Sequence, residues 1–226
     1  MAEPLRIDVI TIFPAMLAGF LGESMLKRAE DMGAVRFQTV NLRDFTSDRH
    51  QTVDDRPYGG GPGMIMKAEP LFKAVESLRT PGARVVLMSP QGRRFDQAAA
   101  REMAGAAHLI FVCGHYEGVD ERVSEALVTD EISIGDYILT NGTLAATVVI
   151  DAIVRLVPNV LGGEGATEEE SFDNGRLEYP QYTRPEVFRE MRVPEVLLSG
   201  DHAAVRRWRD EQARQRTQAR RPDLVK

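Results

Sequence analysis

Residues 85–93 read VVLMSPQGR, an apolar run that leads directly into a glycine-bearing loop. Four apolar residues without polar alternation are typical of a strand that is covered on both faces of a sheet. Similar runs occur before and after it, and segments with helical periodicity separate them. The predicted strands are Ile7–Ile12, Val35–Val40, Val85–Met88 and Leu109–Cys113, and the predicted helices are Ala15–Ala29, Ala68–Leu78, Asp96–Ala104 and Val119–Leu127. Strands and helices in alternation predict an α/β domain with a mostly parallel sheet.

The last third of the chain has a different pattern. Gly142–Val157 is predicted to be a further helix, which Pro158 ends. Leu161–Gln181 is rich in Gly and Glu and lacks periodicity, which is typical of a linker or of a functional loop. Beyond it, Pro185–Arg189 and Asp201–Arg216 are predicted to be helical. We therefore expect three parts, with residues 1–161 as the α/β domain, 162–182 as the linker, and 183–226 as a small, mainly helical domain.

Length and composition are those of a soluble globular protein and exclude several classes. The chain has 226 residues, of which 43% are hydrophobic and 27% are charged. The amino terminus lacks the features of a secretory signal, and no apolar run reaches the roughly 20 residues of a membrane span, so we expect a cytoplasmic protein without membrane contact. The single cysteine, Cys113, excludes an internal disulfide. Without CxxC or HxxxH spacing, no metal site is expected.

The net charge of −6 argues against a protein that coats nucleic acid by bulk electrostatics. The charge is unevenly spread, however, because residues 202–226 carry eight Lys or Arg against three acids. This local excess of +5 is typical of a surface that binds RNA at a specific site.

Four glycine-bearing segments carry residues that could do chemistry. Three of them, residues 89–93, 113–122 and 132–142, follow or contain apolar runs, and open parallel sheets place ligands at the carboxyl ends of their strands. The fourth, residues 54–64, reads DDRPYGGGPGM and matches neither GxxxxGK[ST] nor GxGxxG, which disfavours an NTPase or a dinucleotide fold. Its glycines would allow close approach to a ligand, although taken alone it fits a tight structural turn better.

Several residues in these loops have both a structural and a functional interpretation. Helix amino termini offer free amides to a ligand, but Asp120 fits an N-cap equally well. His115 can serve as an acid or base, yet a lone loop histidine is more often a packing residue. Gly135 and Gly142 leave backbone groups free to bond an adenine edge, and the apolar residues between them can wall such a pocket. Tyr137, taken singly, fits a core side chain better than a ligand contact.

Two further segments carry charged residues. Asp151 and Arg155 lie four residues apart on the predicted helix and fit a surface ion pair. Residues 167–172 include three consecutive glutamates and, by themselves, fit a solvated loop.

Taken together, these segments resemble the bacterial tRNA (guanine-N1)-methyltransferases of the TrmD type, in the SPOUT superfamily. The resemblance rests on an ordered series of motifs over essentially the whole chain. The matching segments are Arg43–Thr46, Asp48–His50, Thr52–Met64, Ser89–Arg93, Cys113–Arg122, Ser133–Leu139, Asp151 with Arg155, Tyr182–Pro185, Val193–Pro194, Val196–Gly200, His202–Ala203 and Arg207–Arg209.

The resemblance implies a SPOUT-type sheet with a deep trefoil knot, a feature that is otherwise nearly absent from proteins. It also implies an obligate homodimer whose active site draws on both subunits, and a C-terminal domain that grips tRNA. S-adenosyl-L-methionine would lie bent within the knot. The cofactor-binding residues that the resemblance implies are Ser89, Pro90, Gly114, Tyr116, Glu117, Ser133, Ile134, Gly135, Asp136, Tyr137, Ile138, Leu139 and Gly142.

The implied reaction is methyl transfer to N1 of the guanosine at position 37, beside the anticodon, with S-adenosylhomocysteine as the other product. The family's catalytic aspartate falls on Glu170 and its arginine near the target falls on Arg155. Glu170 would accept the N1 proton, and Arg155 would stabilise charge on guanine O6. Mg²⁺ is a further implied partner, although the sequence has no dedicated ligand cluster. The implied substrate-binding residues are Asp54, Arg155, Ser171 and His202.

The sequence departs from the family's pattern within the site. Glu170 replaces the usual aspartate and is longer by one methylene, so the neighbouring Glu169 is a rival for the role of base. His115 stands where arginine is common. The turn after Leu139 is altered at Asn141, Thr143 and Ala145.

Two other functions remain open. A knotted methyltransferase that acts on ribosomal RNA or on a ribose hydroxyl would need no guanine-specific base and would tolerate adenine at the target. A non-catalytic RNA-binding protein that keeps the knot would be indifferent to Glu170→Gln.

Overall fold

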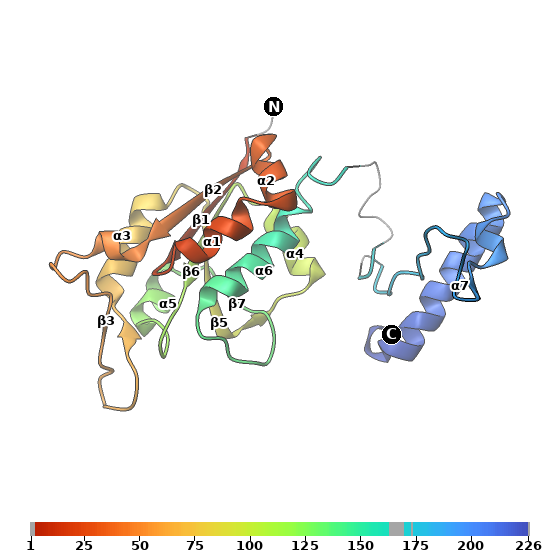
Figure 1. The fold of residues 1–226 in the computed structure, drawn as a ribbon. Helices are drawn as coiled ribbons and strands as arrows, with labels where there is room; N and C mark the ends of the chain where they lie inside the picture. Colours follow the sequence, from red (N-terminus) through yellow and green to blue (C-terminus); the bar gives the residue numbers. More distant parts are fainter. Residues whose placement is uncertain (1–2, 163–169, 173, 226) are drawn as a thin grey trace. The chain divides into compact units, whose positions relative to one another are not determined.

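The computed structural model describes residues 3–162, 170–172 and 174–225. The chain forms two compact units, Met1–Gly162 and Gly163–Lys226. Strands and helices alternate along the first unit (Figure 1). Its strands are β1 (Leu5–Thr11), β2 (Val35–Asn41), β3 (Asp54–Asp55), β4 (Ile65–Met66), β5 (Arg84–Arg94), β6 (His108–Cys113) and β7 (Asp130–Ser133). Its helices are α1 (Ala15–Leu21), α2 (Ser24–Asp31), the 3-10 helix η1 (Leu42–Phe45), α3 (Ala68–Leu78), α4 (Gln97–Ala104), α5 (Glu121–Leu127) and α6 (Gly142–Val154).

Five strands form one parallel sheet in the order β2-β1-β6-β5-β7. The predicted α/β domain with a mostly parallel sheet is thereby confirmed. Strand β1 pairs with β2 on one side and with β6 on the other, so that Arg6 lies opposite both Arg36 and His108. All six residues of β6 are buried, as a strand inside a doubly covered sheet requires.

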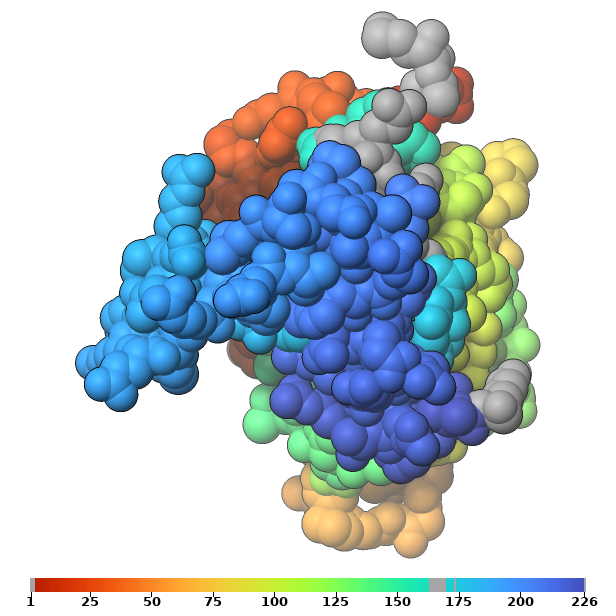
Figure 2. Space-filling view, turned by 90° about the vertical axis from the view of Figure 1, so that its right-hand side faces the viewer, coloured from red at the N-terminus to blue at the C-terminus, as the bar shows by residue number. Residues whose placement is uncertain are grey.

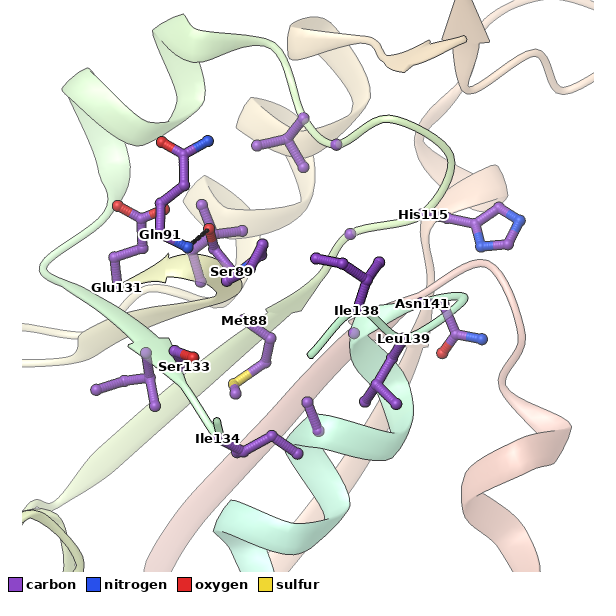
Figure 3. Close-up of a pocket in the computed structure, with 18 of the residues that line it drawn as sticks. Met88, Ser89, Gln91, His115, Glu131, Ser133, Ile134, Ile138, Leu139 and Asn141 are labelled. Atoms are coloured by element: carbon purple, nitrogen blue, oxygen red, sulfur yellow. Dashed lines mark hydrogen bonds between the residues drawn. The ribbon is translucent and has the colours of Figure 1, made fainter. Parts of the chain in front are cut away.

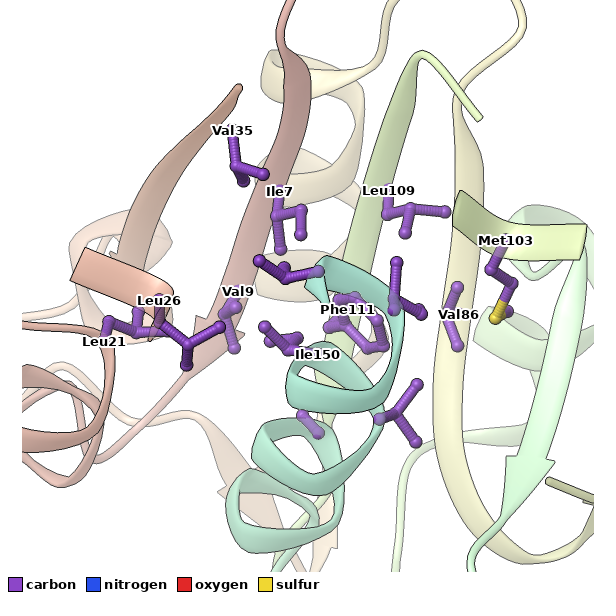
Figure 4. Close-up of a cluster of buried hydrophobic side chains, with 14 of the residues drawn as sticks. Ile7, Val9, Leu21, Leu26, Val35, Val86, Met103, Leu109, Phe111 and Ile150 are labelled. Atoms are coloured by element: carbon purple, nitrogen blue, oxygen red, sulfur yellow. The ribbon is translucent and has the colours of Figure 1, made fainter. Parts of the chain in front are cut away.

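Helices cover both faces of this sheet. One cluster of buried side chains packs the sheet against α1, α2, α4 and α6 and includes Val86 and Met88. Figure 4 shows this cluster, with Ile150 of α6 next to Phe111 of β6. A second cluster packs the opposite face of the sheet against α3, α5 and η1. It includes Val85 and Leu87, which alternate along β5 with Val86 and Met88 of the first cluster. Alternate residues of 85–88 therefore serve opposite layers, which explains why none of the four is polar.

Several element ends differ from the sequence-based expectation. Residues 15–29 form two helices instead of one, because Glu23 has extended backbone angles and Gly22 closes α1 with a hydrogen bond to Ala18. Helix α6 ends at Val154, three residues early, in short turns ahead of Pro158. The apolar pattern also fails to predict β7, because half of that edge strand is Asp and Glu.

The second unit is built around one long helix. Its elements are the strands β8 (Val187–Phe188) and β9 (Met191–Arg192), the 3-10 helices η2 (Glu195–Leu197) and η3 (Pro222–Leu224), and α7 (His202–Arg220). The helix predicted at 185–189 is wrong, since this segment belongs to a hairpin. Its β-branched and aromatic residues favour a strand, and Arg189 and Glu190 form the turn at positive φ. In Figure 2 the lighter blue residues before α7 project as an arm from the darker blue helix.

Among the described residues, we find no helix whose length and apolar character would let it cross a bilayer.

Candidate functional site

A pocket of about 460 Å³ lies at the carboxyl ends of three adjacent strands of the first unit. Its walls are an arch within β5, the loops that follow β6 and β7, and the amino terminus of α6. This is the edge at which open parallel sheets bind ligands, and the volume is that of a small-molecule site. In Figure 3, Met88 lies at the centre, with Ser89 and Gln91 on one side and Ile138 and Leu139 on the other.

The first wall is an arch in β5. Met88 and Arg93 both pair with Ile132 of β7, so the residues between them bulge out of the ladder. Gly92 permits the return to the sheet, because a Cβ there would collide with the backbone of Glu131. Within the arch, the Ser89 hydroxyl oxygen accepts a hydrogen bond from the Gln91 amide at 3.1 Å (Figure 3). The bulge thus holds residues 89–91 over the pocket.

The second wall is the loop after β7. Ser133 is buried, and its hydroxyl accepts from the Gly135 amide at 3.2 Å and donates to the Gly135 carbonyl at 3.1 Å. Gly135 has a φ of +150°, and a Cβ there would lie 2.5 Å from the Tyr137 ring, so this turn requires glycine. The Tyr137 hydroxyl donates to the Ile134 carbonyl at 3.3 Å. Tyr137 is 55% exposed, so its interpretation as a core side chain is wrong.

The third wall is a close contact between the start of α6 and the end of β6. The Gly142 amide donates to the Gly114 carbonyl at 2.8 Å, and a Cβ on Gly142 would lie 3.0 Å from Cys113 Cα. Asn141 caps α6 by accepting a hydrogen bond from the Thr143 amide at 2.9 Å. Asn141 also forms a backbone bridge with His115. These contacts make a backbone cradle that leaves no room for a side chain at position 142.

The structure brings together twelve of the thirteen residues predicted to bind the cofactor. The exception is Asp136, which does not line the pocket although both of its neighbours do. The pocket also includes residues outside that predicted set. These are chiefly Met88, Gln91, Glu131, Thr140 and Asn141, with His115, Gly118, Val119, Glu121 and Ser124 along the loop after β6.

The charges around this pocket are uneven. Three glutamates, Glu117, Glu121 and Glu131, belong to its lining, and none of the lining residues is Lys or Arg. The lining therefore favours a ligand that carries positive charge.

His115 is also part of the lining. Its ring packs edge-on against Phe13 and Tyr116, with ring centroids 5.1 and 4.3 Å away, as its interpretation as a packing residue predicts.

Two ionisable groups beside the pocket have a structural role. Burial raises the pKa of the Cys113 thiol to about 12, so the thiol is protonated and is no nucleophile at neutral pH. Asp120 caps α5 by accepting from the Arg122 amide, and the Arg122 side chain lowers the pKa of that carboxyl. The N-cap interpretation of Asp120 is thus confirmed. No group of three or more His, Cys, Asp or Glu among the described residues is arranged to hold a metal ion.

The glycine-rich segment 54–64 belongs to a hairpin that docks on the loop after β6. Strand β3, which carries Asp54, pairs with β4, and the Met66 amide donates to the Gly118 carbonyl at 2.9 Å. The Glu117 amide donates to the Met64 carbonyl at 3.0 Å. Tyr58 at the far end of the hairpin is fully exposed. The segment therefore contacts a wall of the pocket without lining it.

The remaining predicted site residues lie elsewhere. Arg155 is the C-cap of α6 in the first unit, and His202 is the first residue of α7 in the second unit. Glu170 and His202 both line a cavity of about 520 Å³ within the second unit, which Arg176, Arg206 and Arg209 line as well. Ser171 is partly buried beside it and accepts a hydrogen bond from the Glu178 amide at 3.0 Å. The rival base Glu169 lies outside the described residues.

Comparison with known proteins gives a consistent result over nearly the whole chain. A family model described as tRNA (guanine-1)-methyltransferase TrmD matches residues 5–226. The chain is 59% identical to the tRNA (guanine-N(1)-)-methyltransferase of Moorella thermoacetica, over 98% of this chain and 90% of that protein. It is 53% identical to the protein of the same name from Geobacillus kaustophilus, over 98% and 91%. For that from Dictyoglomus turgidum the identity is 56%, over 98% and 90%.

Proposed function

The chain belongs to the tRNA (guanine-1)-methyltransferase family, and we infer that it transfers a methyl group from S-adenosyl-L-methionine to N1 of the guanosine at position 37 of tRNA. S-adenosylhomocysteine is the other product. The pocket at the ends of β5, β6 and β7 is the single observation that carries this proposal, because its shape and its charge both suit the methyl donor.

The pocket residues fit S-adenosylmethionine in three respects. At Gly142 and Gly135 the backbone itself forms the pocket wall without a side chain, which permits the close backbone approach that an adenine edge needs. Ile138 and Leu139 supply apolar walls. The glutamates of the lining attract the positive sulfonium and ammonium groups. When bound, S-adenosylmethionine supplies the methyl group that the reaction transfers.

We propose two residues for the chemistry on the guanine. Guanine N1 carries a proton that must leave, and the Glu170 carboxylate is the general base that accepts it. Arg155 stabilises the negative charge that develops on guanine O6 as the proton departs. Holding donor and acceptor in line supplies much of the rate enhancement, which is the part played by the pocket walls. Asp54, Ser171 and His202 are proposed substrate contacts, and Mg²⁺ is a proposed aid to the carboxylate.

Charge supports the second unit as the part that grips tRNA. Residues 202–226 carry eight Lys or Arg against three acids, and all but the last few of them belong to α7. A single helix with this excess can track a phosphate backbone. We propose that its cavity, which Glu170 and three arginines line, faces the RNA.

A homodimer is part of the proposal, with residues of two subunits serving each target guanine. Its support is an apolar surface on two adjoining helices of the first unit. Leu144 and Val148 of α6 are 53% and 47% exposed, and Met16 and Phe20 of α1 are 49% and 39% exposed. Each pair has the i,i+4 spacing that places both side chains on one helix face. We also propose that the chain is knotted around the pocket and works in the cytoplasm.

Mapping the methylated atom tests the reaction. tRNA treated with the protein and S-adenosylmethionine should carry the methyl group on N1 of guanine 37, and Glu170→Gln should lower the rate by about a hundredfold or more. A tRNA with adenine at position 37 should remain unmodified. Methylation of that adenine tRNA, or of a ribose hydroxyl, would instead support the rival methyltransferase. Binding without any turnover would support the non-catalytic RNA-binding protein.

Sedimentation tests the dimer. Val148→Glu places a charge in the apolar surface and should shift the protein from dimer to monomer. Met32→Glu is the matched control, because Met32 is equally exposed at the end of α2, outside that surface. A Val148→Glu protein that sediments like wild type would exclude this surface as the interface.

A further inference from the structure

The segment that carries Glu170 is fastened along α7 within the second unit. Four contacts join this segment to α7 and its C-terminal end. They occur in antiparallel order, so that residues later in the segment contact residues earlier in the helix. Phe172 lies under the Arg221 guanidinium at 5.6 Å, and the Leu177 amide donates to the Thr217 hydroxyl at 2.9 Å. The last two contacts are Tyr179 under Arg209 at 4.6 Å and Tyr182 beside Trp208 at 6.4 Å.

Three of the positions that make these contacts, 209, 217 and 221, fall in a series with the buried Ala213 at intervals of four. This spacing places 209, 213 and 217 on one side of α7, and Arg221 is the residue that ends the helix. Ala213 and Thr217 are the buried residues of this helix. We call these four residues the clasp. It accounts for a feature that charge alone leaves unexplained, namely a buried threonine in an otherwise highly polar helix.

Thr217 is the most specific member of the clasp. It is 2% exposed, and its hydroxyl donates to the Ala213 carbonyl at 2.7 Å while it accepts from the Leu177 amide. Both hydrogen-bonding roles of the hydroxyl are therefore used. This hydrogen bond is partly buried, and an amide that loses its acceptor in such a place is destabilising, so the pairing fixes Leu177 at this position of the helix.

Two hydrogen bonds within the segment connect the surroundings of Leu177 to those of Glu170. The Phe172 amide donates to the Arg176 carbonyl at 2.7 Å, and the Glu178 amide donates to the Ser171 hydroxyl at 3.0 Å. These bonds tie the residues just after Glu170 to those on either side of Leu177. Glu170 also lines the same cavity as Leu177 and the clasp residues Arg209 and Ala213.

We propose that the clasp positions the general base, with Thr217 as the principal positioning residue. The inference rests on the proposed role of Glu170. The proposed methyl-donor pocket belongs to the first unit, whereas the Glu170 carboxylate lies on a separate segment, so other contacts must fix the position of that carboxylate. The clasp provides these contacts. Because the clasp belongs to the helix proposed to bind tRNA, it connects the binding of the RNA to the position of the base. A displacement of about 1 Å can cost a hundredfold in rate.

The test compares Thr217→Val, which keeps the shape and removes the hydroxyl, with Thr217→Ser, which restores it. Gln218→Val is the matched control, because it adds the same β-branched residue at the next, exposed position of α7. In single-turnover assays, Thr217→Val should lower the methyl-transfer rate by about tenfold, with unchanged affinities for tRNA and S-adenosylmethionine. Thr217→Ser and Gln218→Val should keep the wild-type rate.

Amide hydrogen exchange supplies a readout that is independent of activity. The Leu177 amide should exchange faster in Thr217→Val and at the wild-type rate in Thr217→Ser. If Thr217→Val does not fold, Tyr179→Leu removes the contact nearer the start of α7 and should lower the rate in the same way. A wild-type transfer rate in folded Thr217→Val would overturn the proposal, and so would unchanged Leu177 exchange.

Failure of the proposed function looks different. If Glu170→Gln transferred methyl groups at the wild-type rate, or if the wild-type protein methylated another atom, the role of Glu170 would be lost. The exchange of Leu177 would in that case still decide whether Thr217 fastens the segment to α7.

Discussion

Gly142 has no room for a side chain. A Cβ there would lie 3.0 Å from Cys113 Cα and from the Gly114 nitrogen, which are backbone atoms that cannot rotate away. Gly142→Ala should therefore displace the start of α6 and lower the unfolding free energy by about 1–3 kcal/mol. The affinity for S-adenosylmethionine should fall with it. Thermal unfolding and calorimetric titration measure the two effects.

Gly19→Ala is the control for that substitution. Gly19 lies inside α1, and a Cβ there would meet nothing within 4 Å. Alanine in place of a mid-helix glycine should raise the unfolding free energy by about 0.5–1 kcal/mol. If Gly142→Ala proved as harmless as Gly19→Ala, the cradle would be looser than its distances indicate.

Cys113 should make stability depend on pH in the alkaline range. Burial raises the pKa of its thiol to about 12, against a smaller lowering by the Thr143 hydrogen bond, whereas an unfolded cysteine titrates near roughly 8.5. Because the folded pKa is the higher one, the stabilising contribution is complete below roughly pH 8.5 and is lost as the pH rises toward about 12. Urea unfolding of wild type and Cys113→Ala across this range should show a smaller decline in the variant.

Reactivity gives a second test of the same thiol. The native protein should resist alkylation by iodoacetamide at about pH 8, and the urea-unfolded protein should react at once. Rapid alkylation of the native protein would contradict the burial of Cys113.

At the scale of elements, one ionic network joins β5, α4 and β7. Arg84 binds Asp130, with Arg84 Nε 3.0 Å from Asp130 Oδ2, and binds Glu102 at 2.8 Å. Arg93 binds Glu102 at 3.0 Å. Burial by itself would raise the pKa of Asp130, but the hydrogen bonds from Arg84 and Thr129 outweigh it and lower the pKa. Hydrogen bonds from Arg93 and Arg84 likewise lower the pKa of Glu102.

Asp130→Asn should destabilise the protein by about 1 kcal/mol at neutral pH, because Arg84 loses the more buried of its two carboxylate partners and keeps only Glu102. A lowered carboxyl pKa contributes stability above the unfolded value of roughly 4, and this contribution is lost as the pH falls below it. The deficit of the variant should therefore shrink in acid. Denaturant titrations at several pH values measure it.

Asp31→Asn is the matched control, since its i,i+4 pair with Lys27 is exposed on both sides. It should change the unfolding free energy by less than about 0.5 kcal/mol. Equal effects of the two substitutions would show that the Asp130 network is no stronger than a surface pair.

The elements that sequence reasoning predicts well are those with a uniform pattern. The run at 85–88 and the buried strand β6 mark the sheet because every residue in them faces a layer of helices. Edge strand β7 begins with Asp and Glu and therefore lacks the continuous apolar run that identifies the inner strands. The hairpin of β8 and β9 depends on Arg189 and Glu190 at positive φ, a conformation in which glycine is the usual signal.

The site shows the same division. The pocket residues within β5 and those after β6 and β7 could be predicted because the family resemblance covers them and the sheet brings these segments together. Met88 was not predicted, since the last residue of an apolar strand has the same pattern as a core residue. The contact of Leu177 with Thr217 spans 40 positions and leaves no periodic trace, so only the folded chain reveals it.

At the scale of the whole molecule, the proposed site residues are distributed over both units. The pocket and both core clusters lie within Met1–Gly162, whereas Glu170 and α7 lie beyond it. A fragment of residues 1–162 should therefore fold and bind S-adenosylmethionine with nearly the affinity of the full chain, yet methylate no tRNA. Calorimetry and a methyl-transfer assay check both parts. A folded fragment that failed to bind would show that the donor needs residues of the second unit.

The pairing of β1 with β6 has a consequence during synthesis. Arg6 lies opposite His108, so the first strand leaves the ribosome about a hundred residues before its neighbour in the sheet. At ribosomal speeds of about 5–20 residues per second, the nascent amino terminus waits roughly 5–20 s with β2 as its available sheet partner. During that interval its apolar side chains are open to chaperones and to aggregation, and a slower supply of codons before residue 108 would prolong the exposure.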